Sequence, residues 1–219
     1  MFLYENKYIE STDFISVLSS FNRIIIELKY PNEYFNVIFK IILFIKESYY
    51  SDKDFKISIY FSNIKAIDKY FQKTKIDYIK ICDKITEIKN DDFGSFYKCT
   101  NLKKVFFELP SLLSLIGNYA FSYCTSLKDI TIPSSVTTIG NNSFSYCKSL
   151  TKIIIPSNVQ KIGSHAFFYC SNISEITFDG HSSLKKICSS TFVGCKSLIQ
   201  ITIPSSVSII ESTAFGECT

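Results

Sequence analysis

The sequence is almost without arginine: Arg23 is the only one among 24 basic side chains. Proteins that read nucleic acids depend on arginine for bidentate contacts to bases and phosphates, so its scarcity disfavours that class of partner. Histidine is equally scarce, with His165 and His181 both in segments expected to form turns. Neither belongs to a metal-ligand array, and no C-x-x-C pair occurs. Signatures of serine hydrolases, zinc peptidases and P-loop nucleotide-binding proteins are missing as well. We therefore expect no catalytic residues, no metal site and no cofactor.

Long apolar segments are also lacking. Charged residues Glu5, Lys7 and Glu10 interrupt the first ten residues, so no standard signal peptide is predicted. The most apolar stretch, residues 37–45, is nine residues long and contains Lys40. A bilayer requires about 20 apolar residues, so no membrane span is expected. The chain still has 219 residues of which 46% are apolar, enough for a folded core.

An internal repeat dominates the second half of the sequence. Six cysteines are separated by 25, 23, 23, 25 and 23 residues, and each has a phenylalanine three residues before it. Between them recur a leucine or isoleucine, two apolar residues spaced by one, a valine or leucine, and an isoleucine followed in several copies by glycine. The unit reads L-x-x-I-x-I-P-S-S-V-x-x-I-G-x-x-x-F-x-x-C. A repeat of this length predicts a solenoid whose coils bury their apolar residues only by stacking on one another.

The I-x-I element of each unit predicts a short strand. Alternation at period two turns both isoleucines inward and the middle residue outward, and stacked coils pair these strands into one parallel sheet. Prolines 133, 156 and 204 follow the strand and end it, because proline donates no backbone hydrogen bond. Glycines 117, 140 and 163 allow a tight turn, including one with positive φ. The two 25-residue copies place their extra residues at 108–110 and 179–181, in turns.

The segment from Ser126 to Cys147 resembles the BspA-like class of leucine-rich repeats, and the resemblance extends over residues 99–219. This class occurs in surface proteins of anaerobic bacteria and of trichomonad and amoebic protists. The resemblance implies an α/β repeat solenoid of leucine-rich-repeat type, with coils of 23–25 residues. It also implies adhesion to host or matrix proteins at a cell surface.

The N-terminal third follows the repeat less closely. Ile79, Ile81, Ile85 and Ile88 keep the spacing of a degenerate coil, and the sequence allows an earlier coil from about residue 55. Over residues 32–48 the polar side chains form one stripe at helical spacing, which predicts a helix. We therefore expect a helix-containing capping segment over residues 1–75 and the solenoid over residues 76–219.

The recurring cysteines are interpreted as a structural ladder. Stacking would bring neighbouring thiols within the Cα range of a disulfide, so that alternative remains open. A position shared by every coil is better explained by a small buried thiol that fills a tight corner. The ladder consists of Cys99, Cys124, Cys147, Cys170, Cys195 and Cys218.

The outward strand residues are the candidate binding surface, because such rows form the concave face on which solenoids usually meet partners. One row is Lys104, Asp129, Lys152, Glu175 and Gln200, and the other is Phe106, Thr131, Ile154, Thr177 and Thr202. Mixed charge favours a protein partner over nucleic acid, and the outward apolar residues suit a contact patch. Alternatively, threonine and isoleucine occur there only because they favour strands.

The predicted function is non-enzymatic protein binding at a cell surface. The alternative is an intracellular scaffold that uses the same face, because no signal peptide or membrane anchor is recognised. The sequence leaves the oligomeric state and the identity of the partner open.

Overall fold

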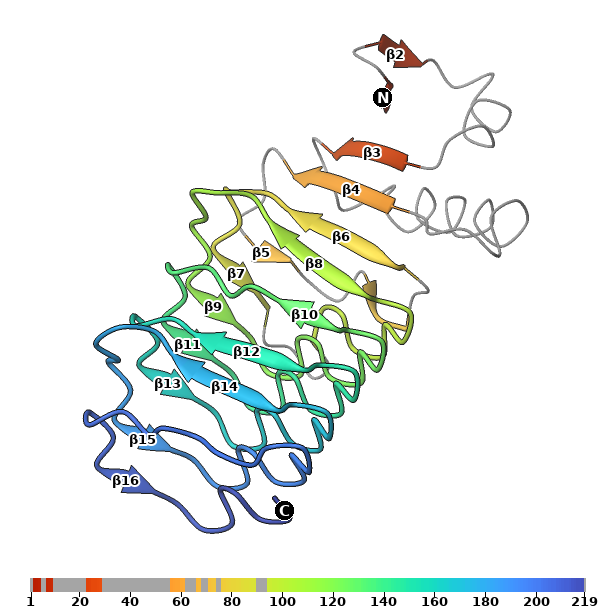
Figure 1. Cartoon of the computed structure of the whole chain (residues 1–219). Helices are drawn as coiled ribbons and strands as arrows, with labels where there is room; N and C mark the ends of the chain where they lie inside the picture. The colour runs from red at the N-terminus through yellow and green to blue at the C-terminus, as the bar shows by residue number, and fades with distance from the viewer. Residues whose placement is uncertain are drawn as a thin grey trace.

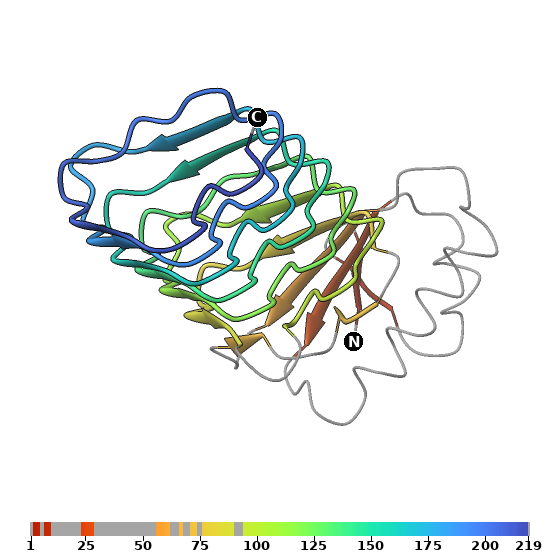
Figure 2. The same cartoon turned by 90° about the horizontal axis from the view of Figure 1, so that it is seen from below.

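The computed structural model describes residues 71–73, 76–89 and 94–218 in full. Of the preceding chain it describes the backbone of five strands: β1 (Phe2–Tyr4), β2 (Lys7–Ile9), β3 (Arg23–Leu28), β4 (Lys56–Phe61) and β5 (Ala66–Ile67). The helix predicted over residues 32–48 lies outside the described residues. From β6 onward the described chain winds into coils that stack along one direction, as Figures 1 and 2 show.

The I-x-I elements form the first strand row. It continues from β4 through β6 (Tyr78–Ile81), β8 (Lys104–Phe107), β10 (Asp129–Ile130), β12 (Lys152–Ile155) and β14 (Glu175–Phe178). All pairs in the row are parallel; β10, β8, β6, β4 and β3 make one sheet, and β12 and β14 make another. The predicted phase is confirmed in β12, where Ile153 and Ile155 are buried and Ile154 is 44% exposed.

The prediction of one parallel sheet is wrong, because a second row of two-residue strands runs along the coils. These strands form the second strand row: β7 (Glu87–Ile88), β9 (Leu115–Ile116), β11 (Thr138–Ile139), β13 (Lys161–Ile162), β15 (Lys186–Ile187) and β16 (Ile209–Ile210). β5, β7, β9, β11 and β13 pair in parallel, as do β15 and β16. The isoleucine that precedes the glycine position of each unit lies here, and these isoleucines pair from coil to coil, as Ile116, Ile139 and Ile162 do.

The strand ladders extend to the N-terminal side of residue 76. β4 pairs with β6 through Ile57 and Ile79, and β5 pairs with β7 through Ile67 and Ile88, at the place of the earlier coil that the sequence allows. β3 then pairs with β4 over six residues, and this strand was not predicted. β1 and β2 form a separate antiparallel pair.

A continuous phenylalanine stack runs through the core. Consecutive rings from Phe71 to Phe215 lie 5.0–5.5 Å apart between centroids, with nearly parallel planes. The first six rings are completely buried and Phe215 is half-buried. Each of the five inner rings, from Phe96 to Phe192, therefore contacts the ring one coil before it and the ring one coil after it, which ties the coils together.

The cysteine of each coil lies beside this stack. Its Sγ donates to the backbone carbonyl of the phenylalanine one coil earlier, at 2.8–3.5 Å, as in Cys147 to Phe121 O and Cys170 to Phe144 O. All eight cysteines are free thiols, and five ladder members are fully buried while Cys218 is half-buried. Among the described residues no cluster of histidine, cysteine and carboxylate side chains could hold a metal ion. The thiol thus fills the corner and adds a second hydrogen bond to a carbonyl that, from Phe96 O onward, also accepts from a cysteine N–H of its own coil, as Phe121 O does from Cys124 N.

The glycines after the second strand row are required by close packing rather than by positive φ, which none of the three adopts. A Cβ on Gly117 would lie 2.4 Å from Lys89 O, and one on Gly140 would lie 2.6 Å from Asn118 N. Positive φ occurs instead at the residue before several ladder cysteines, including Tyr146 with φ 58°. Within the described chain, no helix has the length and apolar character needed to cross a bilayer.

Candidate protein-binding surface

The first strand row presents outward side chains over several coils. Phe106 and Ile154 are 42% and 44% exposed. Thr131 comes between them in the series and Thr177 follows Ile154, and both threonines are exposed. Gln200 and Thr202 are exposed too, but they lie on a segment of the last coil that forms no strand. The structure therefore places seven of the ten predicted surface residues on strands of one row and Thr131 directly after β10, and it places the last two beside the row.

Ion pairs between neighbouring coils organise the charge on this row. Lys104 Nζ lies 2.9 Å from Asp129 Oδ1, and Lys152 Nζ lies 2.5 Å from Glu175 Oε1. The pairs are about half exposed, so each contributes little to stability. Hydrogen bonds from Lys152 and Thr177 hold the pKa of Glu175 below its ordinary value, and its carboxylate is ionised at neutral pH. Along the row the signs run basic, acidic, basic, acidic.

Lys104 also lies over an aromatic ring of the row. Its Nζ is 5.4 Å from the centroid of Phe106, within the range of a cation–π contact. The exposed ring is thus flanked by a cation that is itself paired to a carboxylate. This combination of an apolar centre and balanced charge is typical of surfaces that bind proteins.

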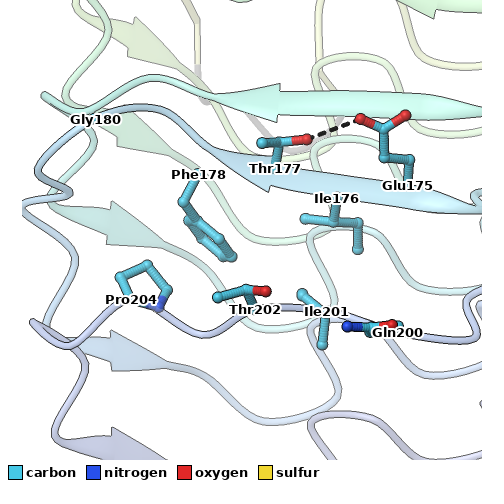
Figure 3. A pocket seen from close by; sticks show the side chains of 9 residues that line it. All are labelled: Glu175, Ile176, Thr177, Phe178, Gly180, Gln200, Ile201, Thr202 and Pro204. Atoms are coloured by element: carbon cyan, nitrogen blue, oxygen red, sulfur yellow. Dashed lines mark hydrogen bonds between the residues drawn. The ribbon is translucent and has the colours of Figure 1, made fainter.

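A groove opens at the C-terminal end of the row. Figure 3 shows Ile176 and Phe178 projecting from β14 toward the last coil, where Ile201, Thr202 and Pro204 lie. The groove has a volume of about 540 Å³, within the range of ligand-binding clefts. Its lining residues are Glu175, Ile176, Thr177, Phe178, Gly180, Gln200, Ile201, Thr202 and Pro204. Four of these were predicted surface residues.

The groove exists because the last coil separates from β14. β12 pairs with β14 over four residues, whereas no strand of the described chain pairs with the other edge of β14. The nearest backbone hydrogen bonds between these coils run from Ser197 N to Ser171 O at 3.1 Å and from Ser208 N to Lys185 O at 3.0 Å. Sequence reasoning missed this feature, because the last coil carries the same I-x-I-P pattern as its closed neighbours.

Tyrosines form a second feature that was not predicted. Tyr97, Tyr123, Tyr146 and Tyr169 are half-buried and pack in series, with ring centroids 5.9, 4.5 and 5.5 Å apart. The hydroxyl of Tyr169 donates to Glu217 Oε2 at 2.8 Å. Burial and the neighbouring tyrosines raise the pKa of Tyr123. The Tyr-Cys dipeptide at residues 123–124, 146–147 and 169–170 was the signal that could have revealed three of these four tyrosines.

Neither of the two histidines lies on a strand of the first strand row. His165 has φ 58° and packs against Phe168 with ring centroids 5.1 Å apart. His181 lies exposed in the turn after β14. Neither is brought together with a carboxylate or cysteine cluster in the described residues.

A family model described as a BspA-type leucine-rich repeat region of six copies matches residues 35–103 and 92–219. The chain belongs to this family. The BspA-type match begins well before the cysteine ladder, in agreement with the early strands β4 and β5. Leucine-rich-repeat proteins generally bind other proteins and are typically not enzymes.

Solved structures of other leucine-rich-repeat proteins are similar to this chain. A leucine-rich repeat protein from Bacteroides ovatus is 27% identical over 76% of this chain, with a TM-score of 0.57. The leucine-rich repeat protein of T. pallidum is 26% identical over 70% of this chain and 72% of its own, with a TM-score of 0.61. The chain spans 40% of the length of the Bacteroides ovatus protein. No curated protein matches the chain.

Proposed function

We propose that this chain is a non-enzymatic binding module that meets a protein partner on the first strand row, in the manner of a cell-surface adhesin. The observation that carries the proposal is the exposed pair Phe106 and Ile154 on a row of otherwise polar residues. Apolar side chains at the centre of a surface with paired charges supply most of the binding energy in protein interfaces. The proposed partner is a host or matrix protein.

A second candidate is a scaffold that uses the same face inside the cell. The observation in its favour is that all eight cysteines are free thiols. Proteins in oxidising compartments usually pair their cysteines, whereas thiols persist in the cytosol. Both candidates use the same surface and differ in where the partner is met.

Substitution of the two apolar residues tests the surface. Phe106→Glu combined with Ile154→Glu should weaken partner binding by about thirtyfold or more, the loss expected for a hot spot. The matched control is Leu109→Glu with Leu112→Glu, which adds the same charge at residues that are 76% and 59% exposed in the turn after β8. Immobilised wild-type protein and both variants are compared for capture of extracellular-matrix proteins and of lysate proteins. Equal capture by all three proteins would contradict binding on this row.

Surface biotinylation of intact source cells separates the two candidates. The chain has 23 lysines, many of them exposed, so the protein is labelled if it is outside. A labelled chain supports the adhesin. An unlabelled chain that is abundant in the lysate supports the scaffold.

A further inference from the structure

The edge of β14 that faces the groove has no strand beside it in the described chain. A strand edge carries backbone N–H and C=O groups that form hydrogen bonds with any extended segment laid along it. Pairing is also interrupted between β10 and β12, but there Ile132 and Ile153 remain buried, so the coils stay closed. Between β14 and the last coil, by contrast, Ile201 and Ile203 are only half-buried. The edge of β14 is therefore both unpaired and accessible.

The side chains along the groove define what would fit there. Ile176 is buried on its floor with half-buried Ile201 facing it, so the floor is apolar. A segment paired with β14 would turn alternate side chains toward this floor and the others toward solvent. Apolar residues are therefore required opposite Ile176 and Phe178.

Charge adds a third requirement at the start of the groove. Along the row, Lys104 is followed by Asp129, and Lys152 by Glu175, and the members of each pair are in contact. The next position in the series is Gln200, which is neutral. On its groove side Glu175 therefore has a neutral neighbour, and a basic residue in an added strand would continue the alternation.

We propose that the groove takes an extended segment of a partner protein, which adds to β14 as a parallel strand with a lysine or arginine opposite Glu175 and apolar residues opposite Ile176 and Phe178. This inference rests on the proposed function, since it names the form in which a protein partner is bound. The chain itself contains a segment with this pattern: β12, whose Lys152, Ile153 and Ile155 pair with the same three residues on the opposite edge of β14.

A peptide of residues 149–157, with threonine in place of Ile154 and a fluorescent label, serves as the probe. Fluorescence anisotropy should show saturable binding to the full chain in the micromolar range. Glu175→Lys should weaken binding about tenfold, and a peptide with glutamate in place of its lysine should recover that loss on the variant. Gln200→Lys should also weaken binding, because the new lysine supplies the missing cation from within the chain. The matched control is Asp129→Lys, which makes the same charge change on the row away from the groove and should alter binding less than twofold.

Several outcomes would overturn the inference. One is that the peptide shows no saturable binding to the wild-type chain. Another is that Asp129→Lys and Glu175→Lys weaken peptide binding equally. A third is that the peptide with glutamate in place of its lysine does not recover binding to Glu175→Lys. Concentration-dependent dimerisation that the peptide abolishes would also overturn it, since the occupant would then be a second copy of the chain. Circular dichroism of each variant verifies that the fold is intact.

The peptide-binding test can fail independently of the partner-capture test of the proposed function. Phe106→Glu with Ile154→Glu leaves the groove unchanged and should bind the peptide as the wild type does. If that variant captures the partner normally while the peptide still binds to it, the patch around Phe106 and Ile154 is not the main interface and the groove inference stands. If the peptide does not bind to the wild-type chain while the Phe106→Glu with Ile154→Glu variant loses partner capture, the proposed function stands and the groove inference is wrong.

Discussion

Removing one ring from the middle of the phenylalanine stack should cost far more stability than removing the ring at its end. Phe144 is completely buried and stacks at 5.3 Å on both Phe121 and Phe167. Phe144→Ala leaves a cavity and removes two ring contacts, and buried phenylalanine truncations cost about 3–5 kcal/mol. Phe215 is half-buried and stacks at 5.4 Å on Phe192 alone, so Phe215→Ala should cost about 2 kcal/mol.

Urea unfolding followed by circular dichroism measures the difference. Because repeat arrays can unfold in stages, the first transition and the overall midpoint are both compared. Phe144→Leu is the conservative control and should cost about 1 kcal/mol, since it retains most of the apolar volume. If Phe215→Ala destabilised the protein as much as Phe144→Ala, the stack would not be a continuous core, and the reasoning would be refuted.

Two further predictions concern the glycines and the thiols. Gly140→Ala should lower the free energy of unfolding strongly, because the added Cβ would lie 2.6 Å from backbone atoms. Gly216→Ala should be tolerated, because the nearest atoms to its added Cβ are 3.4 Å away. Thermal melts of both variants test this, and equal melting temperatures would contradict it. Burial raises the pKa of the Cys147 thiol, so the folded state keeps its proton where the unfolded chain, with an ordinary pKa of about 8.5, loses it. Stability should therefore fall as pH rises above about 8.5, more steeply in the wild type than in Cys147→Val, and an equal slope in the two proteins would argue against a buried thiol.

The sequence predicts most of the solenoid because burial repeats at a fixed interval. Alternation in Ile153-Ile154-Ile155 is enough to assign both the strand and its phase, and the structure buries the first and third side chains. The second strand row was missed for a physical reason. A two-residue strand such as β13 contains one inward isoleucine and has no period of its own, so only its pairing with β11 defines it.

The candidate surface was predictable in composition but not in shape. Outward positions follow from the strand phase, which is why Phe106 and Ile154 were found. The groove beside β14 depends on how far one coil separates from the next. Thr202 lies in the same I-x-I-P context as Thr131, yet the segment around Thr131 begins in a paired strand and that around Thr202 does not. Local sequence does not encode that separation.

The contact between each ladder thiol and a carbonyl one coil earlier has a consequence for how such chains change length. Each described Sγ bond spans 26 or 28 residues, from a cysteine back to the phenylalanine of the preceding unit. Duplicating or deleting a whole unit restores every thiol and ring contact with a new neighbour. Adding part of a unit between Phe144 and Cys147 would separate the Cys147 thiol from Phe121 O and the Phe144 ring from its stack. Extra residues are accommodated at the turn after the first strand row, as at Asp179 and Gly180. Lineages that carry this repeat should therefore differ by whole coils, with smaller insertions confined to that turn.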